Sequence, residues 1–291
     1  MKKNRTPLLG ACTVALALLL AGCATGPMGM KGASLEHFPS ANEDSRAQFL
    51  IIHYTVTDWP ASVRALTQAG RGVSAHYLVR DEPAGVYQLV DENRRAWQAG
   101  VSSWAGNTNL NSSSIGIEIV NQGFTESTDV PPVRTYYPFP QAQIDEVIRL
   151  SKDIVARHHI KPEHVLGHQD IAPGRKSDPG PLFPWKQFYA AGLIAWPDAA
   201  QVAIKQTEYE QTGVLPDIAW AQDKLGRFGY ELPHNGLFDE KTRSVILTFQ
   251  LKYRPSRFDG MLDAETAALI DVATTKGGMV MAPQPDPIAK K

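Results

Sequence analysis

The sequence predicts an α/β fold in which a mixed central β-sheet is flanked by helices and followed by a smaller helical domain. Short apolar, strand-like runs predict the strands, at residues 49–54, 75–79, 86–90 and 115–120. Between residues 141 and 159 the apolar side chains recur at helical spacing. Because strands and helices alternate along the chain, we expect a sheet that is covered by helices.

Composition fits one core-forming domain plus a smaller one. The chain has 291 residues and 31.9 kDa, with 43% hydrophobic residues, which is enough for both. The formal net charge of -1 gives no electrostatic reason to expect a nucleic-acid partner. The sequence also implies no protein partner.

The N-terminus predicts a secretory lipoprotein signal over residues 1–22. Three basic residues precede an apolar run, residues 7–20, that is too short to span a bilayer comfortably. The run ends in L-A-G-C, which resembles a bacterial lipoprotein signal, so Cys23 would become the lipidated first residue. Ala24 follows, where an aspartate would favour the inner membrane. We therefore expect an outer membrane lipoprotein facing the periplasm, with a plain signal peptide as the alternative.

The rest of the chain divides into four predicted segments. Residues 23–47 are rich in Gly, Met, Ser and Ala and are typical of a tether, and residues 48–197 contain the predicted sheet. Residues 206–272 carry a weak repeat, G-x-x-D-x-x-T, whose aspartate can cap a following helix. Residues 273–291 are rich in Pro and Lys near their end, and we expect them to be disordered.

A Pro/Gly-rich stretch, G-H-Q-D-I-A-P-G-R-K-S-D-P-G-P, holds the strongest candidate site. A catalytic zinc site takes three nitrogen, sulfur or carboxylate ligands and keeps a fourth position open. His168 and Asp178 could supply two, and His53 is the best third candidate because a buried strand holds a ligand rigidly. Taken singly, an Asp-Pro-Gly is an ordinary turn, and a histidine after an apolar run is usually a core residue.

The set of motifs is more specific than its members. I-I-H-Y-T, S-I-G-I-E, A-W-Q-A-G, G-H-x-D and K-x-D-P-G-P together resemble the type-2 zinc N-acetylmuramoyl-L-alanine amidases, a family of phage lysozymes, peptidoglycan-recognition proteins and anhydromuramyl-peptide amidases. The resemblance covers nearly the whole chain after the signal and is strongest to an outer-membrane lipoprotein amidase of enterobacteria. The C-terminal repeat resembles the three-helix peptidoglycan-binding domain, with a packing appendage that has no glycan affinity as the alternative.

This resemblance implies a type-2 amidase fold and a role for five residues. The ligands of a Zn2+ cofactor fall on His53, His168 and Asp178. The catalytic carboxylate falls on Glu118 and the catalytic lysine on Lys176.

Three further residues fall at substrate-side positions, namely Trp97, Gln98 and His76, and His76 is expected to be a packing or substrate-wall residue rather than a ligand. Gln98 stands where many members have a histidine in A-W-H-A-G. Other members place a tyrosine just before the histidine that corresponds to His76. In this chain that position is Ala75, so Glu118 is expected to carry the proton transfers.

The implied reaction hydrolyses the amide between N-acetylmuramic, or 1,6-anhydro-N-acetylmuramic, acid and L-alanine in peptidoglycan and muropeptides. Two other functions stay open. A non-catalytic peptidoglycan-binding receptor of the same fold typically lacks a ligand or the carboxylate, and a metallo-D-Ala-D-Ala carboxypeptidase would not explain S-I-G-I-E or K-x-D-P-G-P. Since the C-terminal domain supplies none of the five groups, we expect its removal after about residue 205 to spare hydrolysis of small muropeptides.

Overall fold

The computed structural model describes residues 38–283. The predicted signal, Cys23 and the end of the predicted tail therefore lie outside the described residues. Residues 44–283 belong to one compact unit, which holds all the elements below. Among residues 38–283, no helix combines the length and the apolar character that a membrane span requires.

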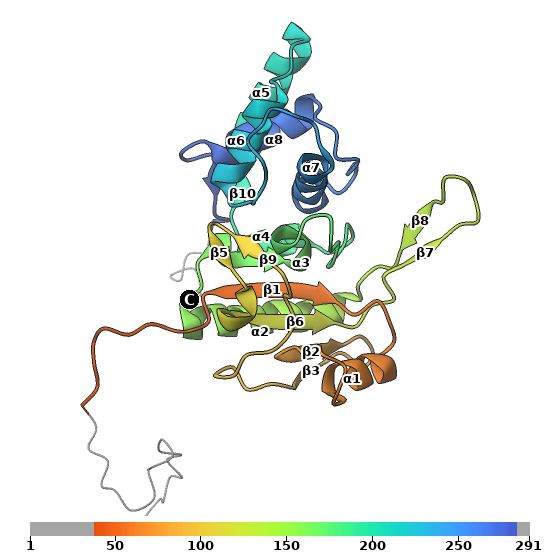
Figure 1. Cartoon of the computed structure of the whole chain (residues 1–291), viewed down its shortest axis with the longest axis vertical. Helices are drawn as coiled ribbons and strands as arrows, with labels where there is room; N and C mark the ends of the chain where they lie inside the picture. Colours follow the sequence, from red (N-terminus) through yellow and green to blue (C-terminus); the bar gives the residue numbers. More distant parts are fainter. Residues whose placement is uncertain (1–37, 284–291) are drawn as a thin grey trace, which may run out of the picture. The chain divides into compact units, whose positions relative to one another are not determined.

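A five-stranded mixed sheet forms the centre, as predicted, in the order β3-β2-β6-β1-β9 (Figure 1). β3 is antiparallel to β2, whereas the other neighbours are parallel. β9 was not predicted, because a three-residue strand has no recognisable periodicity. The strands are β1 (Phe49–Tyr54), β2 (Tyr77–Arg80), β3 (Gly85–Gln88), β6 (Ser114–Ile119) and β9 (Val165–Gly167).

The register of the parallel strands places the candidate residues at one edge of the sheet. Parallel strands present their carboxyl ends together, and this is where α/β proteins place their ligands. His53 lies opposite Glu118 in the β1–β6 pair. His168 follows directly after Gly167, the last residue of β9, which pairs with β1.

One face of the sheet is covered by α2 (Gln141–His158). Successive strand residues point to opposite faces, so every second residue of β1 and β6 contributes to this core. Leu50 and Ile52 of β1 lie in this core, which we call the α2-side core. In Figure 1, α2 runs along the sheet. Its buried residues recur every three or four positions, which gives the helix one apolar face: Ile144, Val147, Leu150 and Ile154.

The core on the opposite face includes residues of the C-terminal helices α6 (Ile218–Phe228), α7 (Glu240–Tyr253) and α8 (Ala264–Thr274). α5 (Ala199–Thr212) packs against α8. The core on this side, here called the C-terminal-side core, joins sheet residues to helix residues: Phe49, Ile51 and Leu166 with Leu225, Phe249 and Ile270. The two aspartates of the repeat, Asp239 and Asp263, cap α7 and α8 as predicted, accepting from the backbone N–H three residues on.

Three predicted boundaries need correction. Ala47, placed in the tether, is fully buried in the α2-side core. The predicted start of the C-terminal domain, residue 206, falls inside α5, and the three predicted helices follow as α6, α7 and α8. Residues 273–283 are ordered, because β11 (Met279–Val280) pairs with β10 (Trp196–Pro197). This pairing joins residues more than 80 positions apart and has no local sequence signal.

Shorter elements connect these layers. α1 (Trp59–Thr67) begins at Asp58, whose carboxylate accepts from the Ala61 N–H. The hairpin of β7 and β8 extends away from the sheet in Figure 1. The remaining elements are β4 (Ser103–Trp104), β5 (Asn107–Thr108), β7 (Phe124–Glu126), β8 (Arg134–Tyr136), α3 (His168–Ile171) and α4 (Trp185–Ala190), with 3-10 turns at Leu110–Ser112 and Pro162–His164.

Candidate metal centre and active site

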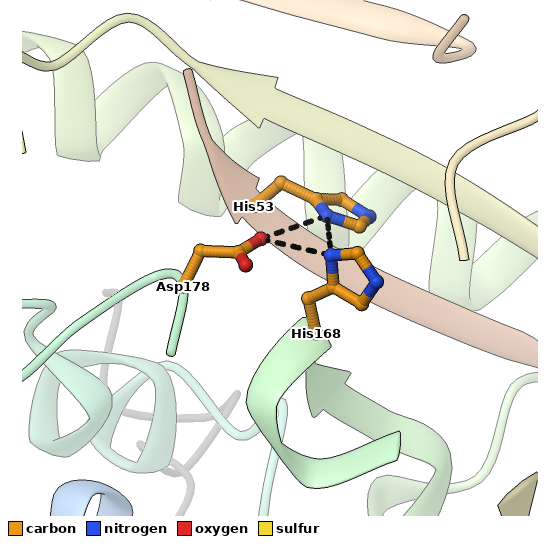
Figure 2. Close-up of side chains that lie close together, drawn as sticks. All are labelled: His53, His168 and Asp178. Atoms are coloured by element: carbon orange, nitrogen blue, oxygen red, sulfur yellow. Dashed lines mark hydrogen bonds and ion pairs between the residues drawn. The ribbon is translucent and has the colours of Figure 1, made fainter. Parts of the chain in front are cut away.

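His53, His168 and Asp178 converge on one point, as predicted (Figure 2). The Nδ1 atoms of the two histidines are 3.0 Å apart, and Asp178 Oδ2 lies 3.0 Å from His53 Nδ1 and 3.1 Å from His168 Nδ1. Three mutually close ligand atoms of this kind form one face of a tetrahedron, so the fourth vertex stays free. Two nitrogens and one carboxylate oxygen are a donor set that fits zinc.

Local structure explains how Asp178 reaches the two histidines. The loop after α3 folds back on itself, and the Gln169 N–H donates to the Asp178 carbonyl at 2.9 Å. Gly167 permits this return, because a Cβ there would lie 2.8 Å from Pro179 Cδ. The glycine before His168 is therefore required by the close packing of the two ligand segments.

A chain of hydrogen bonds fixes the orientation of His53. His53 Nε2 lies 2.5 Å from Gln98 Oε1, and Gln98 Nε2 donates to Ser114 Oγ at 2.6 Å. Ser114 Oγ in turn donates to the Leu110 carbonyl at 2.6 Å, which can only accept. The Ser114 hydroxyl must therefore accept from the Gln98 amide, whose oxygen faces His53. His53 then carries its proton on Nε2, and its Nδ1 lone pair is free for a metal.

Gln98 supports His53 and also lines the cavity described below, so its predicted substrate-side position stays a prediction. Its side chain is buried behind His53, and no more than 8% of the residue is exposed. Gly116 makes the room, because a Cβ there would lie 2.7 Å from Gln98 Cγ. The glycine of S-I-G-I-E, Gly116, is the sequence feature that could have indicated a side chain packed closely against β6, which the structure identifies as Gln98.

His168 is oriented by a backbone carbonyl. Its Nε2 lies 3.0 Å from the Ala99 oxygen, so its Nδ1 faces His53 and Asp178. Arg175 donates to the same oxygen at 2.7 Å and to the Val101 oxygen at 2.6 Å, which ties the ligand loop to residues 99–101. Sequence reasoning missed Arg175, although it lies inside the motif of His168 and Asp178.

Asn111 was also missed, and no sequence feature indicates it. Its Oδ1 accepts from the backbone N–H groups of Gln98 and Ala99, at 2.9 and 2.7 Å. One side chain thereby holds the backbone of both residues that orient the histidine ligands.

His76 is a packing residue, which is one of the two roles predicted for it, and not part of the substrate wall, which was the other. The residue is fully buried. Its Nδ1 accepts from the Gly116 N–H at 3.0 Å, and its Nε2 lies 3.1 Å from the Arg94 oxygen. Burial is the largest influence on this ring and lowers its pKa, so it is neutral near pH 7. A side chain that is enclosed and hydrogen-bonded at both nitrogens cannot reach a substrate.

A cavity of about 250 Å³ opens beside the triad. Trp97 is 53% exposed at this cavity, where a sugar or peptide could reach its ring. Lys176 is exposed, and Glu118 is partly buried. The Glu118 Oε2 atom is shielded from solvent and has no hydrogen-bond partner among the described residues. The cavity is lined, among others, by Tyr54, Trp97, Glu118, His168, Lys176 and Asp178.

The two carboxylates of this site differ in proton affinity. Burial raises the pKa of Glu118 to about 7, with the charge on Asp178 adding to this effect and His53 and Lys176 opposing it. Burial acts in the same sense on Asp178, but the two histidines outweigh it and hold the pKa of that carboxyl well below its usual range. Two carboxyl groups with such different pKa values are typical of a site in which one stays ionised, here Asp178, and the other exchanges a proton, here Glu118.

Comparison with known protein families agrees with this geometry. Residues 43–181 match the N-acetylmuramoyl-L-alanine amidase family, and residues 215–270 match a putative peptidoglycan binding domain. The N-acetylmuramoyl-L-alanine amidase AmiD of Escherichia coli is 42% identical over 278 residues, which cover 91% of this chain and 97% of that protein.

The chain belongs to the N-acetylmuramoyl-L-alanine amidase family. The predicted family, fold class and enzyme class are thereby confirmed.

Other relatives share the catalytic part or the whole architecture. The 1,6-anhydro-N-acetylmuramyl-L-alanine amidase AmpD of Enterobacter cloacae is 37% identical over 118 residues, 40% of this amidase and 56% of AmpD. The solved structure of E. coli AmiD with anhydro-N-acetylmuramic acid-L-Ala-D-gamma-Glu-L-Lys has a TM-score of 0.74 at 40% identity, covering 86% of this chain and 96% of that one. Pseudomonas aeruginosa AmpDh3 with anhydromuramic pentapeptide also has a TM-score of 0.74, at 38% identity, covering 87% and 100%.

Proposed function

We propose that this amidase is a zinc enzyme that cleaves the amide between the muramic lactyl group and L-alanine in peptidoglycan and muropeptides. The observation that carries the proposal is the juxtaposition, in one cavity, of a His-His-Asp triad with the unpartnered carboxylate oxygen of Glu118. A receptor that only binds peptidoglycan has no need of this carboxylate.

Two solved relatives hold anhydromuramyl peptides, one with a tripeptide stem and one with a pentapeptide. We propose on this basis that 1,6-anhydro-muramyl ends are substrates, in addition to ordinary muramyl ends. The 53% exposed ring of Trp97 is the side chain best placed to pack against the sugar or the stem.

His53, His168 and Asp178 would hold the zinc ion through Nδ1, Nδ1 and Oδ2. When bound, zinc supplies Lewis acidity and lowers the pKa of a water molecule at the free position. A dication would also lower the pKa of Glu118 from about 7, because positive charge favours the carboxylate. Near neutral pH the carboxylate form that can accept a proton would then predominate.

Glu118 would remove a proton from the attacking water and return it to the alanine nitrogen as the C–N bond breaks. Lys176 would place a positive charge near the carbonyl oxygen, where negative charge develops. Burial of Tyr54 beside Asp178 raises the pKa of its phenol to about 12, so its hydroxyl remains protonated and can donate at the cavity wall.

The test is mass analysis of the products from an anhydromuramyl pentapeptide that ends in D-Ala-D-Ala. The proposal predicts free anhydro-sugar and an intact pentapeptide, with no reaction after a chelator and recovery with zinc. Release of one D-alanine would indicate a carboxypeptidase, and an unchanged substrate that is nevertheless bound would indicate a receptor.

We further infer that the enzyme is an outer membrane lipoprotein that faces the periplasm and is anchored through Cys23. The basic N-terminus, the apolar run, L-A-G-C and Ala24 support this. Several acyl chains hold a protein firmly where one is marginal. Cys23→Ala should abolish lipid labelling and membrane fractionation, whereas Cys12→Ala, within the predicted signal, should change neither. Unchanged labelling of Cys23→Ala would contradict the anchor.

A further inference from the structure

A buried ion pair joins the C-terminal helices to the loop that carries the metal ligands. Lys252 Nζ, from α7, lies 3.0 Å from Asp170 Oδ2 of α3. Only 4% of the Lys252 side chain and none of the Asp170 side chain is exposed. Removing two charges from water in this way costs free energy, so each charge depends on the other for its compensation.

Asp170 links this ion pair to His168. Its Oδ2 also accepts from the Gly167 N–H at 2.8 Å, at the start of the turn on which His168 sits. Its Oδ1 accepts from the Tyr230 hydroxyl at 3.2 Å. Gly167 and Asp170 therefore bracket the ligand histidine, and both remaining partners of the carboxylate come from the C-terminal region.

Lys252 makes two further contacts beneath the site. It donates to the Val165 carbonyl of β9 at 3.2 Å, and its Nζ lies 4.3 Å from the centre of the Trp185 ring. Trp185 packs at Gly167, where a Cβ would meet both the Trp185 ring and Pro179, the residue after ligand Asp178. Lys252 thus contacts β9, which leads to His168, and the Trp185 ring, which packs at Gly167.

We propose that Lys252 and Tyr230 are positioning residues of the metal centre, so that the peptidoglycan-binding region completes the catalytic site from behind. Neither residue lines the substrate cavity. Both act through Asp170 by holding the turn that aims His168 at the metal. The inference rests on the proposed function, in which the triad binds zinc.

The test measures the zinc dissociation constant by competition with a chromogenic chelator, together with kcat and KM on an anhydromuramyl tripeptide. Loss of a residue that orients a metal ligand typically weakens metal binding 10- to 100-fold. Lys252→Met should therefore weaken zinc binding about 10-fold or more and lower kcat at limiting zinc, with KM unchanged.

Lys224→Met is the matched control. Lys224 Nζ lies 2.9 Å from Asp271, and both residues belong to the C-terminal helices, so the same substitution removes an ion pair without touching Asp170. Its zinc binding should equal that of the wild type. Tyr230→Phe, which removes one hydroxyl, should weaken zinc binding between about 2- and 10-fold.

A double variant keeps the test decisive if Lys252→Met does not fold. Asp170→Asn together with Lys252→Met removes both charges but keeps an oxygen for the Gly167 N–H. It should bind zinc more tightly than Lys252→Met, or fold where that variant does not. Wild-type zinc binding in Lys252→Met and Tyr230→Phe would overturn this inference alone. A wild-type protein that binds no zinc would overturn the proposed function, and this inference with it.

Discussion

The two faces of the central sheet are covered by different parts of the chain. Leu50 and Ile52 pack against α2, which lies between the sheet strands in sequence. Phe49 and Ile51 point the other way and belong to a core that includes residues of α6, α7 and α8, the first of which begins at residue 218. His53 continues the second series, since side chains alternate along a strand. The catalytic face is thus the face that the peptidoglycan-binding region completes.

This difference changes the expected role of the C-terminal region. A domain that only binds glycan could be removed without harm to the chemistry. Here one core joins Phe49 and Ile51 to residues of α6, α7 and α8. α7 also supplies Lys252 to Asp170, and the segment after α6 supplies Tyr230. The peptidoglycan-binding region is therefore a structural layer of the enzyme as well.

Truncation after residue 205 should produce the largest effect. The sequence alone predicts that hydrolysis of small muropeptides survives, whereas the shared core predicts that it is lost. Exposure of Phe49, Ile51 and Leu166 would cost about 1.5–3 kcal/mol for each side chain. Their sum approaches the total stability of a typical domain, about 5–15 kcal/mol. Turnover of an anhydromuramyl tripeptide should be lost, whereas truncation after residue 283 should preserve it. Equal kcat in the shorter protein would show that the catalytic face needs no C-terminal cover.

Glu118→Gln should lower turnover by about 100-fold or more while zinc stays bound, because the amide cannot accept the proton from water. His168→Ala is the companion variant and should lose zinc and turnover together. Metal analysis and single-turnover rates separate the two cases. Loss of zinc from Glu118→Gln would make Glu118 a ligand rather than the proton carrier.

Gln98→Ala and Trp97→Ala compare the buried support of the site with its open cavity. Gln98 holds His53, so its loss should weaken zinc binding about 10-fold with KM nearly unchanged at saturating zinc. Trp97 faces the cavity, so its loss should raise KM and leave zinc binding alone. A raised KM with unchanged zinc binding in Gln98→Ala would show that Gln98 acts on the substrate rather than through His53.

The smallest effect concerns Glu92, on the side of the sheet that α2 covers. Burial raises its pKa, but hydrogen bonds from Arg157, His158 and Tyr77 outweigh burial and lower the pKa from 4.5 to about 2. A carboxyl with a depressed pKa in the fold adds stability above its unfolded pKa. This contribution should be complete above about pH 4.5 and disappear as the pH falls toward 2.

Glu92→Gln should flatten this part of the stability profile. The measurement is urea unfolding of the metal-free protein at several pH values between 3 and 6, because zinc binding is itself pH-dependent. An unchanged slope in the variant would show that other carboxyls are responsible.

The sequence predicted those features that short motifs determine, and it missed those that depend on contacts between residues distant in the chain. The strand Phe49–Tyr54 and the three metal ligands follow from short motifs, and the structure brings the ligands together. Gln98 and His76 were assigned by position in a motif, but their roles depend on which neighbours enclose them. Lys252 carries no signal, because its partner Asp170 lies 82 residues away.

Calorimetry of the zinc-free and zinc-loaded protein tests the central claim, that the metal centre and the peptidoglycan-binding helices form one cooperative body. A ligand that binds only the folded state raises the unfolding temperature of the cooperative unit that contains its binding site. We predict one transition, with equal calorimetric and van't Hoff enthalpies, that zinc shifts to higher temperature as a whole. Two transitions, of which zinc moves only one, would contradict the claim.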